Sequence, residues 1–190
     1  MRARATSVLC LAAVILSGCG GGSGKSTRTK STPAPAPTTA TASSGAPTRA
    51  ASFTTVVPHG YTNDTNRARG GPFNFLYLIV GPQRTNINVV RERVGGLTDM
   101  DVIARAELRN VKRILPKAHQ FSPVTVTTVG GDPARAVDYF NSPTGELFHQ
   151  RQVFVAHGGW VYVITYTARP ALYASHLDAL RQVVAGWRWA

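Results

Sequence analysis

The stretch VTVTTVGGDPARAVDYFNSPTGELFHQRQVFVAHGGWVYVITYT, residues 124 to 167, decides the fold. It contains four runs rich in β-branched and aromatic residues, and each run has the length of a strand. Short glycine-bearing segments separate the runs: Gly130-Gly131-Asp132, Asn141-Ser142-Pro143-Thr144-Gly145 and His157-Gly158-Gly159. Because glycine adopts the positive φ angles of tight hairpins, the pattern predicts an antiparallel meander over 124–129, 134–139, 148–156 and 160–167.

The flanking sequence predicts three earlier strands and two helices. The strands are expected at Phe53–Val57, Phe73–Val80 and Ile87–Val94. The first helix is expected to open at Thr98, with Asp101 as the acidic half of a capping box, and to end at Pro116. The last helix starts at Pro170 and carries an apolar stripe through Tyr173, Leu177, Leu180, Val184 and Trp187. This order predicts the α+β class, an antiparallel β-sheet with helices packed on it.

Residues 1–18 have the order of a secretion signal: basic Arg2 and Arg4, an apolar run from Val8 to Leu16, then small residues. The run is about half the roughly twenty residues that a membrane-spanning helix needs. Leu16-Ser17-Gly18-Cys19 resembles the bacterial lipobox, which implies cleavage before Cys19 and a lipid such as palmitate on its thiol. The alternative is an ordinary cysteine in a leader that is cleaved elsewhere or retained. The only other cysteine is Cys10, so the mature chain has no disulfide.

The segment 19–51 is predicted to be a disordered tether. After Cys19 it holds only Gly, Ser, Thr, Ala and Pro with four Lys and Arg, and it therefore has nothing with which to form a core. Gly24-Lys25-Ser26-Thr27 is similar to the end of a phosphate-binding loop, but Cys19 occupies the place of the required first glycine. We therefore expect no nucleotide site there and one globular domain over 52–190.

Several motifs of the folded part together resemble the PsbP-like domains. They are Pro58-His59-Gly60-Tyr61, Asn88-Val89-Val90, Gly131-Asp132-Pro133-Ala134, Gly159-Trp160-Val161-Tyr162-Val163 and Gly186-Trp187-Arg188. The resemblance implies an α/β/α sandwich, shared by PsbP-type photosystem proteins, the Ran-binding import factor of that fold and bacterial lipoproteins, here of the actinobacterial type. It further implies protein binding rather than enzymatic activity. No photosystem role is implied, because the lipobox and tether fit the lipoprotein branch.

The residues give little support to catalysis. The five histidines, at positions 59, 119, 149, 157 and 176, have no spacing that would aim two of them at one metal. The folded part has no Gly-x-Ser-x-Gly elbow and no thiol. Asp99 and Asp101 are adequately explained by helix capping. We therefore expect no enzyme activity, no cofactor and no metal site.

Charge is the stronger signal. The chain has 21 Lys and Arg against nine Asp and Glu, and all nine acids fall within 52–190. Arg105, Arg109, Lys112 and Arg113 share one face of the first helix, interrupted only by Glu107. This face is the candidate contact with anionic lipid or an acidic partner; the alternative is a solvated helix face. Export and the lack of an aromatic-plus-basic motif argue against nucleic acid as the partner.

Two functions follow as hypotheses for a lipid-anchored protein on the extracytoplasmic face of the cell membrane. In the first, the domain is a non-catalytic interaction module that binds an envelope protein, and its aromatic residues are mainly sheet core with some left exposed as a contact patch. In the second, the same residues line a cavity between sheet and helix that binds or transfers a lipid or small apolar ligand. The aromatic residues are Phe73, Phe75, Tyr77, Tyr139, Tyr162 and Tyr166.

Replacing Cys19 with Ala is expected to abolish lipidation, because the acyl group is attached through that thiol. Phase partitioning in detergent and intact mass of the protein measure the effect. An unchanged membrane fraction with no loss of acyl mass would place the anchor elsewhere.

Overall fold

The computed structural model describes residues 47–49, 52–68 and 75–190. The predicted leader, the lipidation site Cys19, most of the predicted tether and Phe73 lie outside these residues. Among the helices that the structure describes, none has the length and apolar character needed to cross a bilayer.

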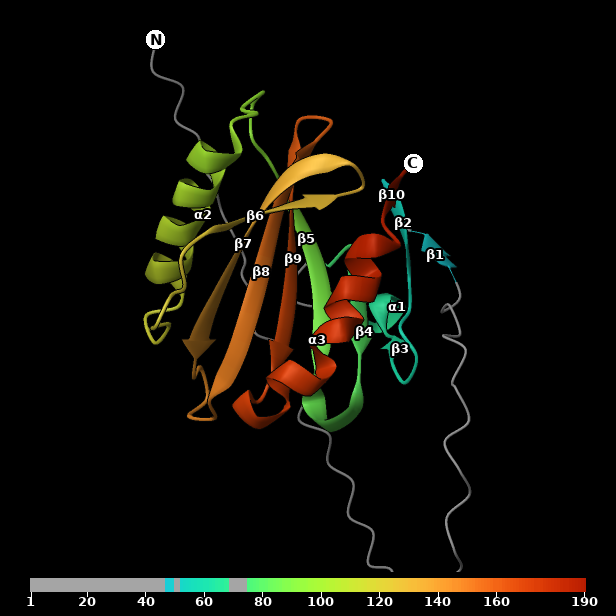
Figure 1. The fold of residues 1–190 in the computed structure, drawn as a ribbon, viewed down its shortest axis with the longest axis vertical. Coiled ribbons are helices and arrows are strands. Elements are labelled where there is room, and N and C mark those ends of the chain that lie inside the picture. Colours follow the sequence, from blue (N-terminus) through green and yellow to red (C-terminus); the bar gives the residue numbers. More distant parts are fainter. Residues whose placement is uncertain (1–46, 50–51, 69–74) are drawn as a thin grey trace, which may run out of the picture.

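Seven strands form one antiparallel sheet in the order β3-β4-β5-β9-β8-β7-β6 (Figure 1). Their bounds are β3 Thr62–Asn63, β4 Tyr77–Val80, β5 Asn86–Arg93, β6 Thr125–Val129, β7 Asp132–Asn141, β8 Phe148–His157 and β9 Trp160–Ala168. A smaller sheet has the order β1-β2-β10, formed by β1 Pro47–Arg49, β2 Phe53–Val56 and β10 Arg188–Trp189. The helices are α1 Thr65–Ala68, α2 Met100–Ile114 and α3 Pro170–Ala185, with a short 3-10 turn η1 at Pro82–Arg84.

The predicted meander is confirmed. Strands β6 to β9 pair in sequence order, each antiparallel to the next. Gly130 and Gly131 form the first hairpin with φ angles of 59° and 89°, and Gly158 and Gly159 form the third with 56° and 78°. A side chain at these positions would strain the left-handed backbone, so these glycines fix the register of both hairpins.

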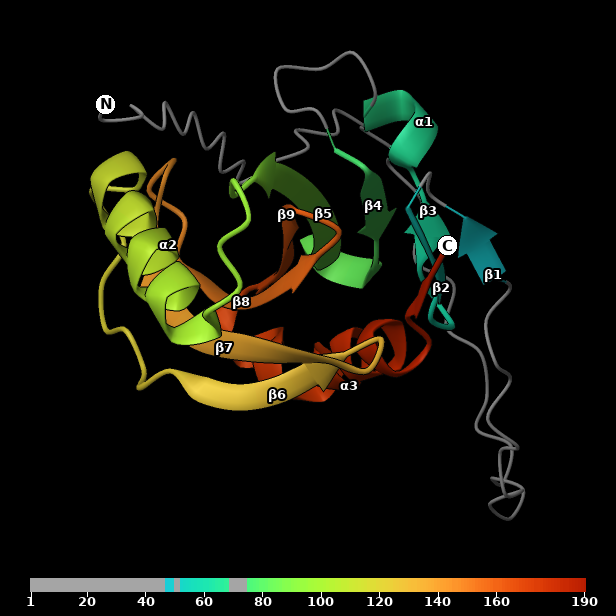
Figure 2. The same cartoon turned by 90° about the horizontal axis from the view of Figure 1, so that it is seen from above.

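Helices cover both faces of the sheet, as the PsbP-like α/β/α sandwich requires (Figure 2). Alternate residues of β9 point to opposite faces. Tyr162 and Ile164 pack with Leu180 and Val183 of α3. Val161 and Val163 pack with the inner residues of α2 on the other face. The result is two separate apolar cores with the sheet between them.

The first predicted strand does not join the main sheet, which corrects the prediction of a single sheet. β2 pairs instead with β10, where Phe53 lies opposite Trp189. The Phe53 ring also stacks on the fully buried Trp187, with a centroid separation of 3.8 Å. Trp187 lies beyond the end of α3, because that helix stops at Ala185. A two-residue strand has no hydrophobic period, so the sequence carried no signal for β10.

Truncating Leu180 to Ala should lower the free energy of unfolding by about 2–5 kcal/mol, because the side chain is 3% exposed in the core under α3. Leu177→Ala is the matched control. Since Leu177 is only partly buried at the border of the same core, its loss should be clearly smaller. Denaturant titration compares the two, and equal small effects would contradict the packing of α3 on the sheet.

Candidate interaction surfaces

The residue that caps the N-terminus of helix α2 is Asp99 and not the predicted Thr98. The Asp99 carboxylate accepts hydrogen bonds from the backbone N–H groups of Asp101 at 2.8 Å and Val102 at 3.2 Å. Asp101 instead binds Arg135 of β7, with 2.7 Å between Oδ1 and Nε. The hydrogen bond and charge of this guanidinium lower the pKa of Asp101. Asp99 thus caps the start of α2, and the Asp101–Arg135 ion pair joins that start to the sheet.

The predicted basic face exists. Arg105, Arg109, Lys112 and Arg113 are all exposed on the outer side of α2. Among the described residues, none of the four forms an ion pair, although the ammonium of Lys112 lies 5.0 Å from the centre of the Phe121 ring. The inner side of α2 carries Met100, Ile103, Ala104 and Val111, which pack on β7, β8 and β9. The structure therefore brings all four predicted cations to one surface.

Glu107 does not interrupt this face, which corrects the prediction. Its side chain turns inward and is 4% exposed. The helical spacing placed it beside the basic residues, but it also lies four residues before Val111, on the apolar stripe. The outer face of α2 therefore has no carboxylate between its cations.

Glu107 faces Glu92 of β5 beneath α2. Apart from Glu92 and Glu107 themselves, no described group gives a hydrogen-bond partner to either oxygen of Glu92 or to Oε2 of Glu107. Burial, then the charge of Glu92 and a hydrogen bond to it, raise the pKa of Glu107 to about 8. Burial also raises the pKa of Glu92. At neutral pH the two carboxyls therefore share a proton, with Glu107 as its main holder.

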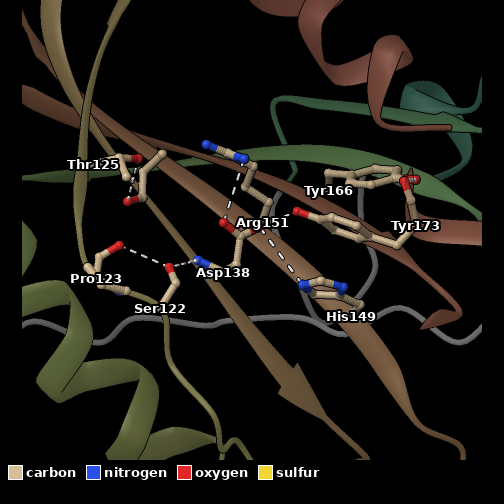
Figure 3. Close-up of polar contacts among 9 residues, drawn as sticks. Ser122, Pro123, Thr125, Asp138, His149, Arg151, Tyr166 and Tyr173 are labelled. Carbon is tan, nitrogen blue, oxygen red and sulfur yellow. Dashed lines mark hydrogen bonds and ion pairs between the residues drawn. The ribbon is translucent and has the colours of Figure 1, made fainter. Parts of the chain in front are cut away.

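A second polar group lies on the α3 face, where β7 and β8 meet the start of α3 (Figure 3). The Asp138 carboxylate accepts a hydrogen bond from the Tyr173 hydroxyl and lies 3.6 Å from an Arg151 nitrogen. The His149 ring stacks between Phe140 and Tyr173, at centroid separations of 4.4 Å and 3.5 Å. Sequence reasoning missed this cluster, because its members come from three elements and have no common spacing.

The chemistry of the Asp138 cluster is structural. Burial lowers the pKa of His149, the nearby Asp138 opposes that shift, and Arg151 adds to it. Burial also raises the pKa of the Tyr173 hydroxyl, and its bond to Asp138 acts in the same direction. A neutral imidazole and a protonated phenol are therefore expected at neutral pH. The Tyr173 hydroxyl, through its bond to Asp138, and the His149 ring, through its stacking on Tyr173, hold the start of α3 on the sheet.

A pocket of about 360 Å³ opens at one end of the sheet, where the β5–α2 connection meets the β6–β7 and β8–β9 hairpins. Its apolar lining is Val94, Leu97, Met100, Pro133, Ala156 and Trp160. Its polar groups include Thr98, Asp132 and His157, and His157 Nδ1 lies 2.8 Å from Asp132 Oδ2. The sequence did not predict this pocket, since its walls come from three separate turns.

The aromatic residues belong mainly to the core, as predicted, but the five that the structure describes leave no exposed contact patch. Phe75, Tyr77, Tyr139, Tyr162 and Tyr166 are all buried, at 3% exposure or less. None of these five lines the pocket, so this pocket is not the predicted cavity between sheet and helix. In the described part of the chain no three of the His, Cys, Asp and Glu side chains come together as metal ligands would.

A sheet of antiparallel strands with one helix layer on each face defines the class of PsbP-like α/β/α sandwiches. The family model that matches, over residues 54–186, is DcrB. The chain belongs to the DcrB family. A comparison with curated proteins finds no match.

Three solved structures show the same fold. LpqN of Mycobacterium tuberculosis is 22% identical with a TM-score of 0.54, over 77% of this chain and 85% of that one. The cyanobacterial PsbP of Synechocystis sp. PCC 6803 is 10% identical with a TM-score of 0.51, over 73% and 86%. A variant of the protein Mog1 is 13% identical with a TM-score of 0.52, over 72% and 89%. The resemblance to the PsbP-like fold is therefore confirmed.

Glu107→Gln should stabilise the protein at neutral pH. The raised pKa of Glu107 means that the folded state binds the proton more tightly than the unfolded state, so stability is full below about pH 4.5 and falls as the pH rises to about 8. A neutral amide removes this loss, and we expect a gain of roughly 1–3 kcal/mol at pH 8 with a flatter pH profile.

Denaturant titrations at several pH values measure this profile. Glu146→Gln serves as the control, because that carboxylate is bound to Arg84 and Arg169 near the surface. Parallel pH profiles for Glu107→Gln and the parent would show that Glu107 is ionised in the folded protein.

Proposed function

We propose that this chain is a membrane-anchored extracytoplasmic lipoprotein, held through Cys19, whose domain over 52–190 is a non-catalytic interaction module for an envelope protein. The observation that carries the proposal is the outer face of α2. Four exposed cations lie there with no ion-pair partner among the described residues, while the one carboxylate of the helix interior is buried beneath them.

The electrostatics of this face favour an anionic target. Near an anionic membrane surface each Lys or Arg contributes about 1 kcal/mol, and the contribution falls off over roughly 8 Å at physiological ionic strength. An acidic protein surface would be attracted in the same way. A tether of more than thirty residues would let the domain reach either target from its anchor.

The relatives support an envelope setting for this proposal. LpqN, which shares the fold, is described as involved in cell envelope biogenesis. A lipobox at Cys19 would place this chain in the same compartment. The non-catalytic part of the proposal rests on the Asp138 cluster, whose titratable groups are bound to one another and packed against α3.

The pocket favours a second function, the binding of a small apolar ligand. Its volume of about 360 Å³ falls at the lower end of the range of ligand sites, roughly 300–1,000 Å³. Trp160 and Leu97 offer apolar surface there, and Asp132 and His157 offer hydrogen-bonding groups at the rim. Such a site could receive one acyl chain or one aromatic group from an envelope component.

Changing Arg105, Arg109, Lys112 and Arg113 together to Gln should spare folding, because all four side chains are exposed. Association of the unlipidated mature chain with vesicles of anionic phospholipid, or with its acidic partner, should weaken by about a hundredfold to a thousandfold at low salt, since four cations at about 1 kcal/mol each are removed. Sedimentation with vesicles at several salt concentrations measures this.

The control variant replaces four exposed arginines outside α2, namely Arg67, Arg93, Arg169 and Arg181, and therefore has the same net charge. It should retain most of the binding. If the α2 variant bound as tightly as the parent at low salt, the basic face would be only a solvated surface.

A further inference from the structure

Strand β6 forms an open edge of the main sheet (Figures 1 and 2). It consists of Thr125, Val126, Thr127, Thr128 and Val129, and its sheet partner is β7 alone. Val126 is 77% exposed, the largest exposure among the large apolar side chains of the described residues. The opposite edge of the sheet is the two-residue strand β3, which is followed at once by α1. The two edges therefore differ in length.

The hairpin geometry shows which backbone groups face outward. A two-residue loop, Gly130-Gly131, joins β6 to β7, so the flanking pair Val129 and Asp132 is hydrogen-bonded. Bonded and non-bonded pairs then alternate, which makes Val126 and Thr128 members of non-bonded pairs. Their N–H and C=O groups point away from β7. Pro133, which has no N–H, lies opposite Thr128 at such a pair and agrees with this assignment.

The edge lacks the usual protection against pairing. Proteins commonly prevent a further strand from pairing with an exposed edge by means of a charged side chain, a proline, a bulge or a covering segment. The five residues of β6 include no charge and no proline, and their register with β7 runs without a bulge. Two β-branched types, Thr and Val, make up the whole strand, which is a composition that favours extended pairing. β6 is thus suited to accept another strand.

The basic face of α2 lies on the same side of the sheet as the exposed side chains of β6. Arg135, directly opposite Val126, reaches from the sheet to Asp101 at the start of α2. Lys112 extends over Phe121, which in turn stacks on Tyr139 of β7 at 5.2 Å. The open edge at Val126 and the start of α2 therefore lie on the same side of the sheet and are joined through Arg135, with positive charge on the helix and none on the strand.

We propose that β6 binds an extended acidic segment of the partner protein as an eighth strand of the sheet. The backbone of the segment bonds to the outward groups of Val126 and Thr128, and its acidic side chains on that side face the cations of α2. The inference rests on the proposed function and deepens it, since it names the chemistry of the partner and the place where it binds.

The test uses the mature, unlipidated chain and a short labelled peptide of alternating glutamate and threonine. Val126→Pro removes one outward N–H and leaves the bonds from β6 to β7 in place, whereas Val126→Thr keeps that N–H. We expect peptide affinity to fall by about tenfold in Val126→Pro and to stay within about twofold in Val126→Thr. Amide exchange at Val126 and Thr128 of the parent should slow when the peptide binds.

Amide exchange at Thr127 and Val129, whose N–H groups bond to β7, reports whether the Val126→Pro variant retains the hairpin. If Val126→Pro loses the hairpin, Thr128→Pro provides a second variant. Unchanged exchange at Val126 and Thr128 with saturating peptide would overturn strand addition, and so would equal affinity of Val126→Pro and Val126→Thr. If exchange of the β6 amides slowed when the protein self-associates without peptide, the occupant of the edge would be a second copy of the chain. That result would overturn the proposal of an acidic segment.

The quadruple α2 variant separates this inference from the proposed function. Suppose that the peptide binds the parent without slowing exchange of the β6 amides, and that the quadruple α2 variant no longer binds it. These two results together would refute strand addition and retain the basic face as a contact. Slower β6 exchange that is unaffected by salt and by the α2 substitutions would refute the electrostatic role on which both proposals depend. A lysine–threonine peptide should show no slowing at all.

Discussion

The pairing of β9 with β5 on one side and β8 on the other is the constraint on which the rest of the structure depends. It joins residues 86–93 to a meander that follows them after a helix, and it runs along almost all of β9. Because alternate β9 residues face opposite sides, the same ladder creates both apolar cores. Helices α2 and α3 then have defined surfaces on which to pack, and the position of every surface residue follows from them.

The elements that sequence reasoning predicted well are those specified by local patterns. Gly130-Gly131 and Gly158-Gly159 mark hairpins between runs of β-branched and aromatic residues, and the stripe around Ile103 and Val111 marks α2. The misses are contacts between distant segments. Phe53 meeting Trp189, or Glu107 meeting Glu92, depends on the tertiary arrangement, and periodicity within one element contains no information about it.

The candidate site shows the same division. The four cations were predictable because an exposed helix face follows directly from the 3.6-residue period. The inward turn of Glu107 was not predictable, since a carboxylate at the edge of an apolar stripe is normally expected to reach water. Its burial removes the one acid that would have neutralised part of the helix face. The open edge of β6 was also hidden in the sequence, because strand order within a sheet is not encoded by any single strand.

The small sheet that joins the two ends of the folded part has a mechanical consequence. Ser52 accepts a backbone hydrogen bond from Ala190, and β2 and β10 lie at the side of the molecule away from α2 (Figure 2). If the chain is anchored through Cys19 as proposed, any pull on the anchor enters the domain through β1, which pairs with β2. The load then acts on the small sheet, with its short β2–β10 ladder and the stacked rings of Phe53 and Trp187. A partner held at α2 and β6 would be the other point of attachment, and the main sheet would carry the load between the two.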